Sequence, residues 1–375
     1  MTAPSDARQE DRPRMMMVQE LIDLMLIPGL SGHEEKVAAH LRSRLAGMGH
    51  STRTDRLGNL ILTVPGDPAL PSVMVFAHMD QLGFFVRRIE PDGLIRVERM
   101  GGVAEKAMLA QAVLLCPPDR DPVPGIVTVK AHHATQSSEK YAVPTAPEIR
   151  IDTGHGSRAL VEQAGIRIGT PVVYRPNVVP LWGDRIAGTS VDDRAGCAVL
   201  LVVAERLEDR AGGPTVHLVW TVQEEFNLRG AVVAAQVLKP DIAIQIDLML
   251  ATDTPDMADR GEMTLGGGPG MSLYSFHGRG TLNGVIPHPA LVRLIEDAAE
   301  AEHLPLQRSA QVGVLTDLSY VQTVGEGVAS IDLGFPMRHS HTALECCDTR
   351  DLDALARLIT ATLGRIDGTL RLERG

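Results

Sequence analysis

The segment SVMVFAHMD, residues 72–80, carries the pattern that decides the fold: a nearly continuous apolar run that stops abruptly at polar residues. Three further runs share this pattern, are rich in β-branched residues and lack strict alternation: TVHLVWTV (215–222), IAIQI (242–246) and VASIDLGF (328–335). Strands that are buried on both faces have sequences of this kind. The four runs therefore predict the parallel centre of one sheet.

Helical patterns lie between these runs. Ser31 and Glu34 form a capping-box pattern, which predicts a helix that continues to about Leu45. Apolar residues at helical spacing predict a second helix over residues 194–208 and a third over residues 291–302. Alternating strands and helices predict an α/β fold with a doubly wound mixed sheet flanked by helices, in which ligands bind beyond the carboxyl ends of the strands.

A different pattern occupies residues 83–181. Short β segments punctuated by glycine and proline follow one another with little helical periodicity, namely FFVRRI, GLIRVERM, AVLLC, PGIVTV and PVVY. We predict a small, β-barrel-like domain at residues 85–183, inserted into an α/β domain formed by residues 1–84 and 184–375. The polar segment 131–148 contains prolines and is predicted to be a loop.

Composition narrows the function. Net charge is −11 and aromatic residues make up 3% of the chain, so the basic surface and stacking rings of a nucleic-acid binder are missing. No apolar run approaches the roughly 18 residues that a membrane span needs. The N-terminal stretch lacks the pattern of an export signal, and the four cysteines form no C-x-x-C pair. These features predict a cytoplasmic enzyme with small substrates.

Each predicted strand ends at side chains that can bind a metal ion. His78 and Asp80 follow the first strand and face the same side, so Asp80 can hold the imidazole of His78 from behind. Taken singly, the other candidates have ordinary explanations as a helix N-cap, solvated strand ends and a surface histidine pair. They are Asp192, Asp193, Glu224, Glu225, Asp247, His339 and His341.

The conjunction of these residues favours a different interpretation. The five segments that carry them all fall at the same edge of one predicted sheet, and together these segments can supply two histidines and three or four carboxylates to a metal site. Two divalent ions bring four positive charges, and three carboxylates with a hydroxide cancel them. Histidine and carboxylate ligands without cysteine are typical of catalytic zinc or cobalt sites. The sequence therefore predicts a dinuclear metal site.

Several segments together resemble the tetrahedral (TET) aminopeptidase family, which includes the glutamyl and deblocking aminopeptidases. The segments are HMDQLG (78–83), VDDRAGC (191–197), QEE (223–225), Asp247 and RHSH (338–341), with IPGLSGHEE near the start, DRLGN (55–59) and IDTG (151–154). They run in order across nearly the whole chain. Three departures concern substrate preference more than metal binding: His339 in place of tyrosine, Asp193 in place of asparagine, and Thr316-Asp317 in a stretch poorer in glycine.

The resemblance implies a co-catalytic dinuclear metallopeptidase with a zinc-peptidase-like core. Such an enzyme removes N-terminal residues from short peptides through a metal-bound water, and here Glu224 would be the general base and Asp80 would support His78. Two divalent ions per subunit are implied, zinc first, with cobalt or manganese as alternatives. The implied ligands are His78 and Asp247 on one ion, Glu225 and His341 on the other, and Asp192 bridging both.

The resemblance also implies that the inserted β domain makes dimer contacts, in a homo-oligomer between a dimer and a hollow dodecamer. Three alternatives stay open: a related metal-dependent amidohydrolase acting on N-acyl amino acids, a glycosidase that uses Glu224 and Glu225, and a non-catalytic binding module. The glycosidase is disfavoured because adjacent residues rarely hold carboxyl groups about 5–9.5 Å apart across a sugar. The sequence leaves open the preferred N-terminal residue, the physiological metal, and the roles of the 131–148 loop and His339.

Overall fold

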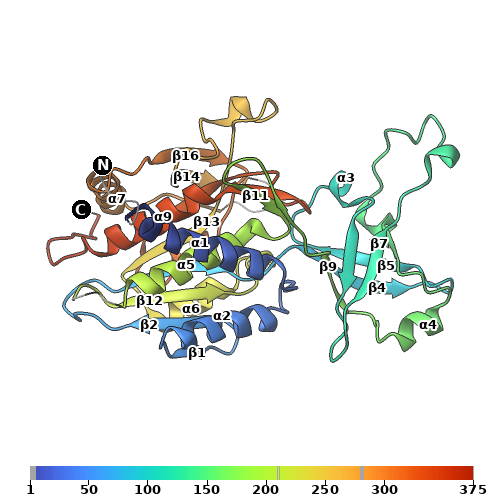
Figure 1. Cartoon of the computed structure of the whole chain (residues 1–375), viewed down its shortest axis with the longest axis horizontal. Coiled ribbons are helices and arrows are strands. Elements are labelled where there is room, and N and C mark those ends of the chain that lie inside the picture. The colour runs from blue at the N-terminus through green and yellow to red at the C-terminus, as the bar shows by residue number, and fades with distance from the viewer. Residues whose placement is uncertain (1–5, 209, 211, 279–282, 375) are drawn as a thin grey trace.

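The computed structural model describes residues 6–208, 210, 212–278 and 283–374 of the chain. A layered α/β body lies beside a smaller β-barrel (Figure 1). The strands of the barrel come from the middle of the chain, so segments on both sides of it build the α/β body. Among the described residues, no helix is both long and apolar enough to cross a membrane.

Twelve of the described strands form one mixed sheet. The path across it is β1 (Thr52–Thr54), β2 (Leu60–Val64), β12 (Val216–Thr221), β3 (Val73–His78), β13 (Ile242–Leu250), β17 (Ala329–Arg338), β18 (Glu345–Asp348), β11 (Arg185–Gly188) and β10 (Val178–Pro180). Off this path, β14 (Gly270–Phe276) pairs with β17, β15 (Gly284–Val285) and β16 (Gln307–Val312).

The centre of this sheet is parallel, as predicted. Strands β12, β3, β13 and β17 are parallel neighbours, and Thr221 lies beside His78 in the register. The side chains of β3 are buried along its whole length, because helices cover both faces. The carboxyl ends of these four strands consequently meet at one edge of the sheet.

Helices pack on both faces, which makes the sheet doubly wound. One face is covered by α1 (Asp6–Met25), α2 (Glu35–Gly47), α5 (Val191–Arg206), α7 (Pro289–Ala301) and α9 (Thr349–Leu363). The opposite face is covered by α6 (Gly230–Leu238) and α8 (Leu318–Val321). Each face of the sheet has its own hydrophobic core, and alternate residues of β3 pack into one or the other. Val73 and Val75 belong to the core on the first face, and Met74 and Phe76 to the core on the opposite face.

The predicted capping box is wrong. Helix α2 begins at Glu35, its N-cap is Glu34, and no side-chain hydrogen bond caps it. The carboxylate of Glu34 instead accepts hydrogen bonds from the backbone N–H groups of Gly32 (2.7 Å) and Gln223 (3.1 Å). The Glu34 carboxylate thus joins its own loop to the segment after β12, a tertiary contact that local sequence could not indicate.

The barrel closes from six strands: β4 (Gly83–Ile89), β5 (Ile95–Met100), β8 (Arg150–Asp152), β7 (Val123–Val127), β6 (Ala112–Leu115) and β9 (Pro171–Tyr174). It has a hydrophobic core of its own, which includes Phe84, Val97 and Val113. Two short helices accompany it, α3 (Glu105–Met108) and α4 (Arg158–Gln163). The domain boundaries at residues 84 and 184 stay a prediction.

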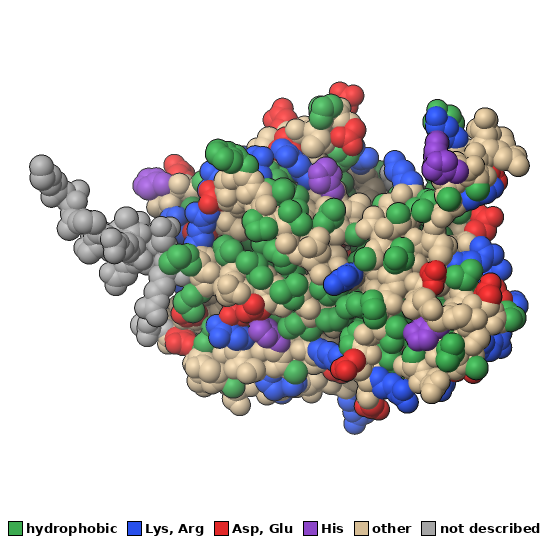
Figure 2. Space-filling model, turned by 45° about the vertical axis from the view of Figure 1, so that its right-hand side comes forward, with side chains coloured by type: hydrophobic (Ala, Val, Ile, Leu, Met, Phe, Trp, Pro, Cys, Tyr) green, Lys and Arg blue, Asp and Glu red, His purple; other side chains and the backbone are tan. Residues whose placement is uncertain are grey.

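The 131–148 segment projects from the barrel as an exposed loop (Figure 1). Its regular structure is confined to two 3-10 turns, η1 (His132–Ala134) and η2 (Ala146–Glu148). On the face shown in Figure 2, acidic and basic side chains are interspersed, and the blue ones form small separate groups rather than one basic patch.

Candidate metal centre

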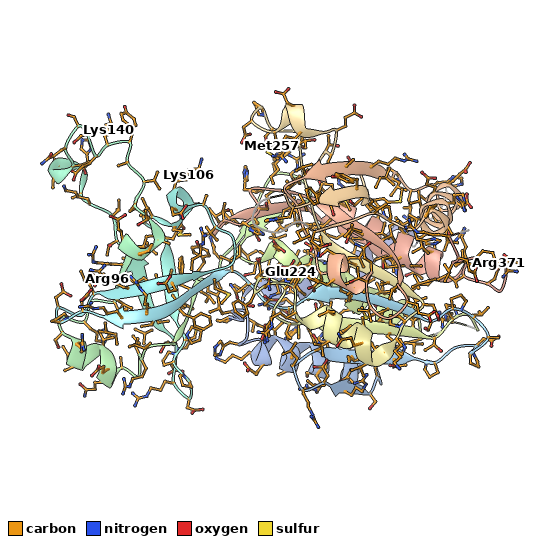
Figure 3. All side chains as sticks on the ribbon, turned by 180° about the vertical axis from the view of Figure 1, so that it is seen from behind. Arg96, Lys106, Lys140, Glu224, Met257 and Arg371 are labelled. Carbon is orange, nitrogen blue, oxygen red and sulfur yellow. The ribbon has the colours of Figure 1, made fainter. Side chains whose placement is uncertain are left out.

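The structure brings the five predicted metal ligands together at the carboxyl edge of the sheet. Ligand atoms of His78, Asp192 and Asp247 all lie within 4.8 Å of one another, as do those of Asp192, Glu225 and His341. Asp192 belongs to both groups. The centre lies where the α/β body meets the barrel, and Glu224 beside it is labelled in Figure 3.

His78 is the last residue of β3 and is 2% exposed. Its Nδ1 lies 3.2 Å from the backbone oxygen of Asp80, which places the ring proton on Nδ1. Its Nε2 lies 3.0 Å from Oδ1 of Asp192 and faces the centre. When a metal ion is bound, the neutral ring can present the lone pair of Nε2 to the site, as a metal ligand must.

His341 follows β17 and has the same arrangement. Its Nδ1 donates to the backbone oxygen of Gly102, at 2.6 Å, and its Nε2 lies 3.3 Å from Oδ2 of Asp192. Gly102 follows strand β5 of the barrel. The inserted part of the chain thus contributes a hydrogen-bond acceptor to the centre. No sequence pattern indicates this contact, because the oxygen belongs to the backbone.

The carboxylate of Asp80 organises the segment that follows β12. It accepts hydrogen bonds from the backbone N–H groups of Glu224 and Glu225, both at 3.0 Å, while its Oδ1 lies 3.5 Å from Nδ1 of His78. Sequence reasoning predicted the contact with His78 alone. Asp80 is fully buried, so it fixes the two glutamates as firmly as it supports the histidine.

The carboxylate of Glu345 likewise holds the backbone of two residues, and both are candidate ligands. Its Oε1 accepts from the backbone N–H of His341 at 2.8 Å, and its Oε2 accepts from that of Asp192 at 3.0 Å. It is 1% exposed and starts β18. One buried carboxylate therefore holds two candidate ligands that lie about 150 residues apart in the chain. Sequence reasoning missed Glu345.

Gln245 was missed as well. It precedes Asp247 by two residues on β13, so both side chains face the same side. Its Nε2 donates to Oδ2 of Asp247 at 3.0 Å, and its Oε1 accepts from the backbone N–H of Leu318 at 2.6 Å. The amide thus orients Asp247 against helix α8. The i, i+2 spacing could have suggested this role.

Left-handed backbone marks the segments that carry the ligands. Ser190, Gln223 and His341 have φ angles of 62°, 58° and 60°. Each such non-glycine residue costs on the order of 1–3 kcal/mol and persists where the surroundings determine it. These residues lie two positions before Asp192, one before Glu224 and on a candidate ligand itself, so the strain is concentrated at the centre.

Not every predicted residue lies in the ligand groups. Asp193 is buried, and its Oδ1 caps helix α5 by accepting from the backbone N–H of Gly196 at 2.9 Å. The N-cap explanation therefore holds for Asp193 and fails for Asp192, whose two carboxylate oxygens lie beside Nε2 of His78 and Nε2 of His341. His339 is exposed and belongs to neither group.

The electrostatics of the centre reflect crowded negative charge. Burial raises the pKa of Glu225 to about 8 and that of Asp247 to about 7, and the charge of Asp192 adds to both. Burial also raises the pKa of Glu224 well above its ordinary value. Although burial opposes it, hydrogen bonds from His341 and His78 hold the pKa of Asp192 well below its usual range.

These residues fit a pair of divalent ions. Buried carboxylates repel one another unless cations balance them. Oε1 of Glu225 is buried, and no described residue supplies it with a hydrogen-bond partner. Two groups of oxygen and imidazole donors without thiolate, joined by one shared carboxylate, form a donor set that suits two catalytic divalent ions.

An open cavity of about 460 Å³ gives access to the centre. The candidate ligands line one wall, together with Glu224, which is 9% exposed. The other walls include apolar residues near the ends of β12, β13 and β16: Leu248 and Leu250 lie on β13, and Leu228, Val314 and Leu315 follow the other two strands. The cavity therefore joins an acidic centre to apolar surface that can contact an organic substrate.

A parallel sheet whose carboxyl edge holds two such ligand groups beside a buried glutamate is typical of dinuclear metallohydrolases. The chain belongs to the M42 glutamyl aminopeptidase family, whose model matches residues 58–358. It is therefore an aminopeptidase, a hydrolase of peptide bonds, and its family implies divalent metal ions.

Relatives cover nearly the whole chain. SgcX of Escherichia coli (strain K12) is 38% identical over 350 residues, which span 92% of this chain and 93% of SgcX. The lysyl aminopeptidase of Pyrococcus furiosus is 30% identical over 345 residues, spanning 90% of this chain and 93% of the relative.

Solved structures share the fold. An aminopeptidase from the archaeon Desulfurococcus kamchatkensis superimposes with a TM-score of 0.88 at 32% identity, covering 95% of this chain and 96% of that one. The Pyrococcus horikoshii TET1 peptidase, which can assemble into a tetrahedron or a large octahedral shell, has a TM-score of 0.83 at 24% identity, with 92% and 99% covered.

Proposed function

We propose that the chain removes N-terminal residues from short peptides with two divalent ions, zinc in the first instance. His78 and Asp247 hold one ion, Glu225 and His341 hold the other, and Asp192 bridges them. The observation that carries the proposal is the pair of ligand groups with Asp192 in common. When bound, the two ions supply a polarised carbonyl and a water acidic enough to attack it near neutral pH.

The side chains of this protein then transfer the proton of the attacking water and orient the base and the histidine ligands. Glu224 is the general base: its carboxylate takes a proton from the attacking water and delivers it to the departing amine, a role commonly worth about 10²- to 10⁴-fold in rate. Asp80 holds the backbone of Glu224, and the Nδ1 hydrogen bonds of His78 and His341 keep their Nε2 atoms directed at the site.

A panel of substrates tests this proposal. The purified protein is stripped with a chelator, assayed on aminoacyl anilides and on N-acyl amino acids, and assayed again after zinc, cobalt or manganese is restored. We expect anilide hydrolysis that disappears on chelation and returns with metal. Hydrolysis of N-acyl amino acids alone would support the amidohydrolase alternative, and activity indifferent to chelators would support the glycosidase.

We further propose that residues 85–183 form the inserted domain between the two parts of the catalytic domain, and that this domain makes dimer contacts in a homo-oligomer between a dimer and a dodecamer. The assembly of the Pyrococcus horikoshii structure supports this proposal. Light scattering coupled to size exclusion measures the mass directly. We also propose a cytoplasmic location, which the four free cysteines support.

A further inference from the structure

A second, smaller cavity adjoins the candidate centre. Its volume is about 20 Å³, enough for one water-sized group. It shares five lining residues with the larger cavity, namely Asp247, Leu248, Leu250, Val314 and Thr316. Its remaining walls come from Met249 of β13 and from β14, β16 and β17, so it extends from the candidate centre along the sheet.

The walls of this smaller cavity carry buried hydrogen-bonding groups. Asp332, Gln311 and Ser275 are 3%, 7% and 5% exposed. No residue within the described ranges supplies a hydrogen-bond partner to Oδ2 of Asp332, Oε1 of Gln311 or Oγ of Ser275. The other carboxylate oxygen of Asp332 accepts from Oγ1 of Thr316 at 3.0 Å, which fixes the orientation of the carboxyl group.

Unsatisfied acceptors in such a place are expensive. A buried polar group without its hydrogen bond costs about 1–3 kcal/mol, and a charged one costs more. A carboxylate oxygen, an amide oxygen and a hydroxyl together suit a compact group that donates several hydrogen bonds and carries a positive charge. A primary ammonium group has these properties and the size of a water molecule.

We propose that the smaller cavity receives the ε-ammonium group of an N-terminal lysine whose four-carbon stem passes from the candidate centre along Val314 and Thr316, which line both cavities. The inference rests on the proposed function, because the candidate centre must hold the α-amino end of the same residue. An acidic N-terminal side chain would bring a further carboxylate beside Asp332, whose pKa burial already raises to about 7. An apolar side chain leaves the acceptors unpaired, and the guanidinium of arginine exceeds the volume available.

The p-nitroanilides of lysine and norleucine test this inference, because norleucine has the same stem without the ammonium group. For the metal-loaded enzyme we expect kcat/KM for lysine to exceed that for norleucine by at least about 10-fold. Asp332→Asn keeps the acceptor for Thr316 and removes the charge, so the ratio should fall by at least about 10-fold. Asp297→Asn, on the exposed side of α7, is the matched control and should keep the wild-type ratio.

Two results would overturn the inference: a wild-type enzyme that cleaves norleucine as well as lysine, or a lysine preference that survives Asp332→Asn. If Asp332→Asn does not fold, Gln311→Leu provides the second variant, and it should lower the same ratio. Failure of the proposed function gives a different result, because no anilide of the panel is then hydrolysed after metal is restored. That outcome would overturn both the aminopeptidase proposal and the lysine preference.

Discussion

Replacing Glu345 by glutamine tests how the candidate ligands are held. The glutamate accepts one backbone hydrogen bond from His341 and one from Asp192, through separate oxygens. Glutamine keeps the shape of the side chain and one acceptor, but its NH₂ group must face the other backbone N–H. One donor is therefore left unpaired at a position that is 1% exposed.

The magnitude follows from this geometry. Losing a hydrogen bond and leaving a buried donor unpaired costs about 1–3 kcal/mol. Because the affected backbone carries Asp192, which belongs to both ligand groups, the loss should weaken metal binding about 10- to 100-fold, as removal of an outer support commonly does. Glu224, the proposed general base, is held by Asp80 instead, so the fully loaded variant should keep most of its kcat.

The assay is a competition titration of metal against a chelating dye, with metal analysis of the dialysed protein. Glu300→Gln, an exposed residue of α7, is the matched control and should bind metal as the wild type does. Thermal unfolding without metal separates a loss of folding from a loss of binding. Unchanged metal affinity in folded Glu345→Gln would refute the reasoning.

Three further predictions follow from named groups. Glu224→Gln should keep both metals and lose about 10²- to 10⁴-fold in kcat; full activity would refute the assignment of the base. His341→Ala should bind one metal fewer per subunit by elemental analysis, and unchanged content would exclude His341 as a ligand. Burial lowers the pKa of His217, so the folded protein favours the neutral ring more than the unfolded chain does. The stability that this contributes is present above the ordinary histidine pKa of about 6.5 and is lost as the pH falls from there through the lower pKa of the folded state. His217→Gln should therefore flatten the decline in urea stability on the acid side, and an unchanged slope would contradict this.

The strands of the catalytic body were predictable because burial on both faces leaves a simple signal. The runs ending at residues 77, 222, 246 and 335 correspond to β3, β12, β13 and β17. Strand β17 nevertheless continues to Arg338, through Pro336, because it pairs with β18 on one side near its end and with β13 on the other. Pairing partners extend strands beyond the point where the apolar run stops.

Residues that act through the backbone could not be predicted in the same way. Glu345 was invisible because its two partners are backbone N–H groups, which every residue except proline has. The predicted capping box was wrong for a related reason: the Glu34 carboxylate accepts a hydrogen bond from the backbone N–H of Gln223, which is far away in the chain. Sequence patterns report periodicity and side-chain chemistry, and these contacts depend on neither.

The place of the barrel in the chain has a consequence for the centre. Strand β4 begins at Gly83, directly after the segment of His78 and Asp80, so the insertion leaves the sheet at the edge where the ligands converge. The segment that follows its second strand, β5, brings the backbone oxygen of Gly102 to His341. An insertion at any other edge of the sheet could not supply this acceptor. The barrel and the centre are therefore coupled by geometry, and a change in how the barrel packs reaches one of the candidate ligands through a single hydrogen bond.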